Sequence, residues 1–481
     1  MADADPGRDA FAAAGSCGEG PADPARVLAG LLALGGLPAG LAAQARLDGR
    51  EPVLPSSFAV GTAAQTTIAA AALAACELGR LRGGPRQEVA VGMRDAAIEC
   101  LGWFSLDGAV PELWDPVSGL YRTADGWVRI HANFAHHRDG ALRLLGLDPA
   151  TAGRPEAEAA LATWRALDFE QAAAERGLVV AALRDFAAWD ATPQGRAVAA
   201  LPLMRFERLG DAPPLDWPPL SDGAPPLDGI RVLDLTRILA GPVGGRALAA
   251  YGADVMLVNA PHLPNIDAIA DTSRGKRSAH VDLGMAEGCA TLGRLVEGAQ
   301  VFVQGYRPGA LAHRGFGPEA VAARRPGIVQ VALSAYGEDG PWAGRRGFDS
   351  LVQTAMGFNR AEGEAAGGAG PRPLPMQILD EATGYLIAFG AAAALRRQRL
   401  EGGSWLVRVS LAQTGHWLRG LGRVPGGFAC EKPADLSPWQ ETGDSGFGRL
   451  CAIRHSARLS ATPARWHRPS VPPGTDPAAW D

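Results

Sequence analysis

Asp380 is the residue of this sequence whose type and position best suit covalent chemistry. It follows the apolar run LPMQIL and opens the predicted helix EATGYLIAFGAAAAL. Ala382 and Gly384 are small, so a substrate could approach the carboxylate, and a helix N-terminus would keep it ionised and nucleophilic at neutral pH. The same position suits a helix N-cap, a structural role in which the carboxylate accepts backbone N–H groups. The local pattern leaves both roles open.

Other catalytic patterns are incomplete. The first strand of the predicted βαβ unit is followed by AGPVGG, and the second ends at Asn259. Neither the Gly-rich turn nor the acidic residue of a dinucleotide site is therefore present. Ser334 lies in LSAYG, which falls short of G-x-S-x-G.

The histidines and cysteines do not indicate a metal centre. The nine histidines never stand at i, i+4 around a carboxylate, and the six cysteines include no CxxC pair. We therefore expect no metal site and no disulfide framework. His136 and His137 are expected to form a solvated helix start.

Strands and helices alternate after residue 228, as in a parallel sheet covered on both faces. This α/β pattern predicts a Rossmann-like domain. The predicted strands are 229–236, 253–260, 299–306 and 327–337, and the predicted helices are 241–252, 286–297 and 318–324.

Residues 117–215 follow another pattern, typical of a small α+β domain. LYRTADGWVRIHANF contains two alternating runs around Asp125–Gly126, which predicts a β-hairpin. Amphipathic helices are predicted at 156–166, 169–175 and 179–188.

A partial internal repeat links the two halves of the chain. IAAAALAACELGRLRGG (68–84) and IAFGAAAALRRQRLEGG (387–403) superpose at an offset of 319, and nine of 19 positions from Thr66 to Gly84 are identical. The repeat places Gly61 opposite Asp380. We interpret this similarity as a partial duplication.

The Pro-rich stretch APPLDWPPLSDGAPP (212–226) marks the main predicted domain boundary, because proline breaks helices and central strands. Together these patterns predict four parts. They are a flexible tail (1–24), a partial copy with the small α+β domain at about 117–210 (25–225), a Rossmann-like catalytic domain (226–425) and an extended C-terminal tail (426–481).

Composition limits the partners and the compartment. The 481 residues carry 46 Lys and Arg against 51 Asp and Glu, a net charge of −5 that argues against nucleic-acid binding. The N-terminus lacks the basic start and apolar core of a signal peptide. Residues 58–76 are free of charge but rich in Ala, Thr and Gly, so we expect a buried core helix and no membrane span. A cytoplasmic location is expected.

Five ordered motifs resemble the class III CoA-transferases, a family that includes formyl-CoA and carnitine CoA-transferases and α-methylacyl-CoA racemases. The resemblance covers about residues 228–412 through GIRVLDLTRILAGPVGGRALAAYGADVMLV, RGKRSAHVDL, VFVQGYRPGALAHRGFG, LSAYGEDGPWAGRRGFDSLVQTAMG and ILDEATGYLIAFGAAAAL. It implies a class III CoA-transferase-like fold, CoA or acyl-CoA as a substrate with no tightly bound cofactor, a small carboxylic acid as second substrate, and a possible homodimer.

The resemblance also implies roles for individual residues. Asp380 matches the catalytic aspartate, which forms an acyl-aspartyl anhydride and then an aspartyl-CoA thioester. The CoA-binding positions that it implies are Ala240, Lys276, Arg277, Gly305, Tyr306, Arg314, Ala335, Tyr336 and Gly337. Phe348 stands where the racemases carry an acid/base histidine, so transfer is favoured over racemisation.

The first half resembles the family in a different order. Residues 58–102 match the helix and strand that follow the catalytic aspartate, and 117–210 match the family's later small domain. We therefore predict that residues 117–210 close over Asp380. A catalytically weakened CoA-ester-binding paralogue, and an intramolecular CoA isomerase or acyl-CoA racemase, remain alternative functions.

Overall fold

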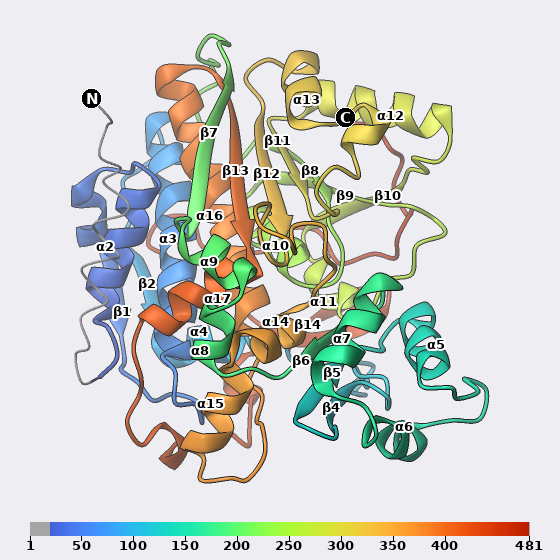
Figure 1. The fold of residues 1–481 in the computed structure, drawn as a ribbon. Helices are drawn as coiled ribbons and strands as arrows, with labels where there is room; N and C mark the ends of the chain where they lie inside the picture. Colours follow the sequence, from blue (N-terminus) through green and yellow to red (C-terminus); the bar gives the residue numbers. More distant parts are fainter. Residues whose placement is uncertain (1–19, 481) are drawn as a thin grey trace, which may run out of the picture.

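A seven-stranded sheet forms the centre of the computed structural model, which describes residues 20–480 (Figure 1). The strand order is β10-β9-β8-β11-β12-β13-β7, and every neighbouring pair is parallel except β13 with the edge strand β7. This confirms the predicted α/β class. The strands are β7 (Met204–Gly210), β8 (Arg231–Leu235), β9 (Asp254–Asn259), β10 (Lys276–His280), β11 (Val301–Gln304), β12 (Val329–Ser334) and β13 (Ser404–Ser410).

Helices cover both faces of this sheet because its strands are apolar on both sides. Val232 of β8 belongs to the core under α10 (Ala240–Ala250), α16 (Ile378–Glu401) and α3 (Val60–Leu81). Its neighbour Leu233 faces the second core, under α12 (Ala286–Gly298) and α13 (Pro318–Arg324).

The two halves of the internal repeat are the long helices α3 and α16, which pack side by side in one core (Figure 1). A carboxylate from a preceding segment caps each helix. Glu51 accepts the N–H of Thr62 at 2.7 Å, and Asp349 accepts that of Asp380 at 2.9 Å. The charge-free stretch 58–76 is buried as predicted. Within residues 20–480, α16 alone is long and apolar enough to cross a membrane, and its apolar window is completely buried.

The small α+β unit contains the predicted hairpin. Strands β4 (Gly119–Arg122) and β5 (Trp127–Ile130) are antiparallel around Asp125–Gly126, and β6 (Val180–Ala182) pairs with β5. The prediction of a helix at 179–188 is wrong, because the β-branched residues Val179 and Val180 lie immediately before and at the start of β6, which completes this sheet. This three-stranded sheet shares one hydrophobic core with the helices α5 (Ala135–Leu144), α6 (Arg154–Leu161) and α7 (Ala166–Glu175). Short helices α8 (Phe186–Asp190) and α9 (Pro193–Ala199) lead out of the unit.

The segments on either side of these units interlock. The Pro-rich stretch 212–226 contains no helix or strand, as predicted, but β7 before it completes the main sheet. Residues 1–19 of the predicted flexible tail lie outside the described residues, and Pro24 already begins α2 (Pro24–Leu34). The remaining N-terminal elements are β1 (Ala45–Asp48), β2 (Val89–Gly92), α4 (Met93–Glu99) and β3 (Phe104–Leu106).

The C-terminal segment is more ordered than the predicted extended tail. Strands β14 (Gln440–Ser445) and β15 (Gly448–Ile453) form a hairpin that pairs with β3, and β16 (Arg458–Leu459) pairs with β2. The prediction failed because the partner strands lie more than 300 residues earlier. Helices α14 (Asp349–Met356), α15 (Phe358–Ala365) and α17 (Leu411–Gly420) complete the part near α16.

Candidate active site

A cavity of about 380 Å³ opens at the carboxyl ends of β8, β11 and β12. Strand β8 lies between β9, the next strand along the chain, and β11, so the strand order reverses direction at β8. Such a switch point is where open α/β sheets bind ligands. Asp380 lines this cavity.

Asp380 lies in the first turn of α16, whose first residue is Ile378. Residues 371–377, which precede this helix, form a loop. Asp349 takes the capping role, since its Oδ2 accepts the backbone N–H of Asp380 and its other oxygen binds Gln353. Within residues 20–480 no donor binds the Asp380 carboxylate, which leaves it available to a substrate.

Burial sets the protonation of this carboxylate. Desolvation, the neighbouring Asp349 and then Glu381 raise the pKa of Asp380 well above its ordinary value. Burial likewise raises the pKa of Asp349, to about 6. This shift opposes the expectation that the helix N-terminus keeps Asp380 ionised, because burial and the two neighbouring carboxylates favour the protonated form. A raised pKa makes the carboxylate a stronger nucleophile once it has lost its proton.

Four of the nine predicted CoA-binding residues share the cavity with Asp380. Ala240 comes from the start of α10, Gly305 and Tyr306 follow β11, and Ala335 follows β12. Parallel strands bring these loops to one edge of the sheet.

Three further predicted residues do not line the cavity. Tyr336 is buried, with its ring centroid 5.0 Å from that of Trp342, and Gly337 follows it in a turn with φ 93°. Arg314 is exposed and donates to the carbonyl of Leu283.

Lys276 and Arg277 do not line the cavity, and their role as CoA ligands stays a prediction. The Nζ of Lys276 is fully buried, 2.9 Å from Oδ2 of Asp234 and 2.8 Å from the carbonyl of Pro242. Arg277 is buried and pairs with Asp254. Adjacent residues of a strand point to opposite faces of the sheet. The Lys276–Asp234 ion pair is completely buried, whereas Asp254, the partner of Arg277, is 29% exposed.

Four arginines that sequence reasoning missed line the cavity: Arg237, Arg307, Arg345 and Arg346. Arg345 lies 3.9 Å from Glu170, and Arg237 donates to the carbonyl of Pro264. Desolvation and then the like charge of Arg307 lower the pKa of Arg346. An excess of cations around a buried pocket favours an anionic ligand. For three of them a signal was available, since Arg307 follows the motif residue Tyr306, and Arg345 and Arg346 shortly precede Phe348.

The small α+β unit does close over Asp380, as predicted. Phe134, His136 and His137 line the same cavity as Asp380. These histidines stand at the start of α5, but His137 is buried, and burial lowers its pKa to about 3. The expectation of a solvated pair is therefore wrong for His137.

Phe348 lines the cavity next to Asp349. The ring of His131 stacks on it from the small unit, with centroids 4.0 Å apart and planes at 17°. Burial lowers the pKa of His131 to about 3, so the stacked ring is neutral. This contact joins the small unit to the segment whose Asp349 caps α16.

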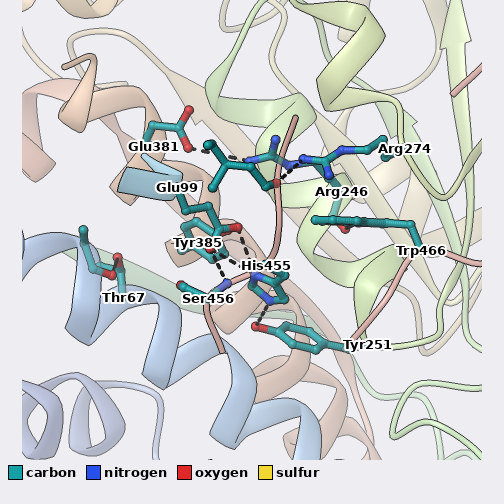
Figure 2. A network of polar contacts seen from close by, with 12 residues as sticks. Thr67, Glu99, Arg246, Tyr251, Arg274, Glu381, Tyr385, His455, Ser456 and Trp466 are labelled. Carbon is teal, nitrogen blue, oxygen red and sulfur yellow. Dashed lines mark hydrogen bonds and ion pairs between the residues drawn. The ribbon is translucent and has the colours of Figure 1, made fainter. Parts of the chain in front are cut away.

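A buried polar network lies beside α16 (Figure 2). Glu99 accepts hydrogen bonds from Tyr385 and from the N–H of Ser456, and lies 2.9 Å from Nδ1 of His455. Nε2 of His455 is 3.0 Å from the hydroxyl of Tyr251. The C-terminal segment therefore contacts α16 at Tyr385, whose ring stacks on that of His455 and does not line the cavity.

Within residues 20–480 no group of three or more His, Cys, Asp or Glu could hold a metal ion. The five cysteines of that range are free.

The fold, with its parallel sheet and small α+β unit, is that of the class III CoA-transferases. The sequence model of CoA-transferase family III matches residues 19–215 and 227–421, and the chain belongs to this family.

Curated relatives cover only parts of the chain. An acyl-CoA transferase of Gibberella moniliformis is 33% identical over 314 residues, 61% of this chain and 55% of that protein. A succinate–glutarate CoA-transferase of Agrobacterium fabrum is 35% identical over 190 residues, 36% of this chain and 47% of that protein. The chain spans about half the length of the curated relatives it matches.

Solved structures are similar over comparable shares. A CaiB/BaiF family protein from Brucella suis is 26% identical with a TM-score of 0.37, and the similarity covers 47% of this chain and 65% of that one. A protein from Mycobacterium tuberculosis is 33% identical with a TM-score of 0.38, over 41% of this chain and 58% of that one.

Proposed function

We propose that the protein is a CoA-transferase in which Asp380 carries the acyl group and then CoA. The observation that carries this proposal is the buried Asp380 carboxylate, free of hydrogen-bond donors, in a cavity lined by four arginines. The substrates would be an acyl-CoA and a small carboxylic acid, both anionic, and the arginines would offset their charge.

The proposed reaction begins when an Asp380 oxygen attacks the thioester carbonyl. The C–S bond breaks, which gives an acyl-aspartyl anhydride and CoA thiolate. The thiolate attacks the Asp380 carbonyl carbon, releasing the first acid and leaving an aspartyl-CoA thioester. The acceptor carboxylate then repeats both steps in reverse order, and acceptor-CoA leaves with the Asp380 carboxylate restored. Covalent steps suit a carboxylate nucleophile.

The CoA chain would pass over the loops that carry Ala240, Gly305, Tyr306 and Ala335, which line the cavity. Arg307 and Arg346 would meet its anionic groups or the substrate carboxylate. Gly337 and Arg314 lie outside the cavity lining and would contact parts of CoA that extend beyond it. The buried Tyr336 would hold this loop in place through its contact with Trp342. A cytoplasmic location and a homodimer complete the proposal.

The test is isotope exchange between an acyl-CoA and its own labelled acid, since this needs no knowledge of the natural acceptor. We would use succinyl-CoA with ¹³C-succinate first, because relatives are named for succinate and glutarate and the cavity is arginine-lined. Acetyl-CoA and butyryl-CoA with their labelled acids follow. Label should enter the acyl-CoA with the wild type and not with Asp380→Asn.

Intact-mass and peptide analysis should locate a CoA or acyl adduct on Asp380. A matched control is Asp339→Asn, an aspartate outside the cavity lining, which should retain exchange. CoA binding by calorimetry without any exchange or adduct would favour the weakened paralogue. Exchange retained by a folded Asp380→Asn variant would refute the assignment of the nucleophile.

A further inference from the structure

The start of the ten-residue helix α5 forms one wall of the cavity that contains Asp380, and the transfer reaction alone gives this wall no role. We call it the α5 wall; its residues are Phe134, His136 and His137, and all three line the cavity. Phe134 is the N-cap residue, and no side chain caps the helix. The first N–H groups of a helix have no partner within the helix and carry partial positive charge, so they favour an anion.

His137 is a second, independent feature of the α5 wall that indicates a ligand. The residue is only 4% exposed, and within residues 20–480 its Nδ1 has no hydrogen-bond partner. A buried polar atom without a partner costs free energy, and a ligand in the cavity would supply the missing partner. His136 lies beside it, with the two ring centroids 4.0 Å apart.

Two arginines extend the α5 wall. The guanidinium of Arg237 lies 5.7 Å from the centroid of the Phe134 ring, and its buried Nε has no hydrogen-bond partner among residues 20–480. Ile238, the next residue, has φ 78°, a left-handed conformation that is costly for a β-branched residue and is found at functional sites. Desolvation and then the charge of Arg346 lower the pKa of His136, so Arg346 acts on the same wall.

The cavity holds more positive than negative charge. Four arginines line it, whereas Asp380 is its one acidic residue among residues 20–480. Arg345 pairs with Glu170, but within that range the other three arginines form no ion pair. The thioester group of a substrate is uncharged and does not balance them. An anionic group elsewhere in the substrate would.

An acyl-CoA offers two kinds of anion, the phosphates of CoA and a carboxylate at the far end of the acyl group. The phosphates are separated from the thioester by the whole pantetheine arm. The far carboxylate of a short dicarboxylic acyl group is separated from it by only a few carbon atoms. Because the α5 wall and Asp380 line one cavity, this carboxylate is the anion that reaches the wall while the thioester carbonyl lies at Asp380.

We propose that the α5 wall, together with Arg237 and Arg346, is the subsite for the far carboxylate of a dicarboxylic acyl group. This inference rests on the proposed function and names its substrate class. The carboxylate would accept hydrogen bonds from the first N–H groups of α5 and from the two guanidinium groups, and such charge-assisted bonds are stronger than neutral ones. The imidazole of His137 would donate a further hydrogen bond from Nδ1.

Paired substrates of nearly equal shape measure this subsite. Succinyl-CoA and 4-methylpentanoyl-CoA differ only in that an isopropyl group replaces the carboxylate. We would measure the exchange of each with its own labelled acid and take the ratio of the two kcat/KM values. The wild type should favour succinyl-CoA by about tenfold or more, the size of one charge-assisted contact. Arg237→Met should lower this ratio by about tenfold and His137→Phe by about fivefold.

His131→Phe is the matched control, because His131 is a buried histidine of the same small unit and does not line the cavity. Phenylalanine can also keep the stack on Phe348. Its ratio should stay at the wild-type value. His137→Gln serves if the phenylalanine variant of that residue does not fold. Unchanged ratios in folded variants of His137 and Arg237 would overturn the proposal.

Free CoA distinguishes the two sources of the anion, because it carries the phosphates and no acyl group. Calorimetry should give the same CoA affinity for the wild type, Arg237→Met and His137→Phe. A lower CoA affinity in both variants, with an unchanged preference for succinyl-CoA, would assign the wall to a phosphate and refute the carboxylate subsite.

Binding of the paired acyl-CoA substrates separates this proposal from the proposed function. An Asp380→Asn protein cannot form the adduct, so its affinities for succinyl-CoA and 4-methylpentanoyl-CoA report the subsite without any transfer. If the wild type shows no exchange, the transferase mechanism fails, yet succinyl-CoA should still bind about tenfold more tightly than its neutral partner. Equal affinities would refute the subsite even if exchange is observed.

Discussion

Replacement of Lys276 by methionine tests the assignment of this residue most sharply. The motif resemblance makes Lys276 a CoA ligand, whereas its contacts place it inside the sheet domain. Its Nζ binds Asp234 and the Pro242 carbonyl, and both side chains of the ion pair are 0% exposed. Methionine keeps the length of the side chain and removes the charge. Asp234 would then be a buried carboxylate with no counter-charge at 2.9 Å.

The contacts that remain set the magnitude. Removal of one partner of a buried ion pair costs about 3–5 kcal/mol, or roughly two to four decades in the folding constant. Oδ1 of Asp234 still accepts hydrogen bonds from the N–H of Thr236 at 3.1 Å and from its hydroxyl at 2.5 Å. We therefore expect the lower end, about 3 kcal/mol, for Lys276→Met. The double variant Lys276→Met with Asp234→Leu should recover part of this loss, since no buried charge is left unpaired.

Urea unfolding followed by circular dichroism measures the stability of each variant, and calorimetry measures CoA binding to the folded proteins. We expect a lower unfolding midpoint for Lys276→Met and unchanged CoA affinity in the folded fraction. Unchanged stability together with a tenfold or larger loss of CoA affinity would refute this reasoning. It would show that Lys276 leaves Asp234 to bind CoA.

Three further predictions concern the cavity. Because burial and Asp349 raise the pKa of Asp380, its carboxylate form is lost as the pH falls. The exchange rate should therefore decline on acidification, with a midpoint well above 3.8. An exchange rate that does not change between pH 4 and 7 would contradict this. Arg346→Ala should raise KM for succinyl-CoA by about tenfold with a smaller change in kcat, because a charge-assisted contact is worth roughly 1.5–3 kcal/mol; equal KM values would exclude the contact. Phe348→His should introduce deuterium exchange at Cα of 2-methylacyl-CoA in D₂O, measured by mass spectrometry, as the new imidazole would line the cavity with Asp380; absence of exchange in a folded, CoA-binding variant would argue against that geometry.

The sequence was informative where chemistry follows local order. Gly305, Tyr306 and Ala335 follow strands of one parallel sheet, so their meeting at its carboxyl edge was predictable. The partners of Lys276 and Arg277 were not predictable, because the position of a residue in a motif does not tell whether its side chain points to a ligand or to a carboxylate of the protein. Asp234 and Asp254, their partners, lie 42 and 23 residues earlier and carry no local signal.

The repeat explains why the two halves of one chain contribute unequal parts to the site. A Cβ on Gly61, the counterpart of Asp380, would lie 2.4 Å from Val53, 2.9 Å from Met93 and 3.1 Å from Glu51. An aspartate has no space there, so the first copy cannot form a second site of this kind. That copy contributes instead the small unit over the cavity and Glu99 behind α16, where the C-terminal segment meets it through His455. The composite site depends on contacts between segments hundreds of residues apart. The order of the motifs can be read from the sequence, whereas the packing of these segments is seen only in the structure.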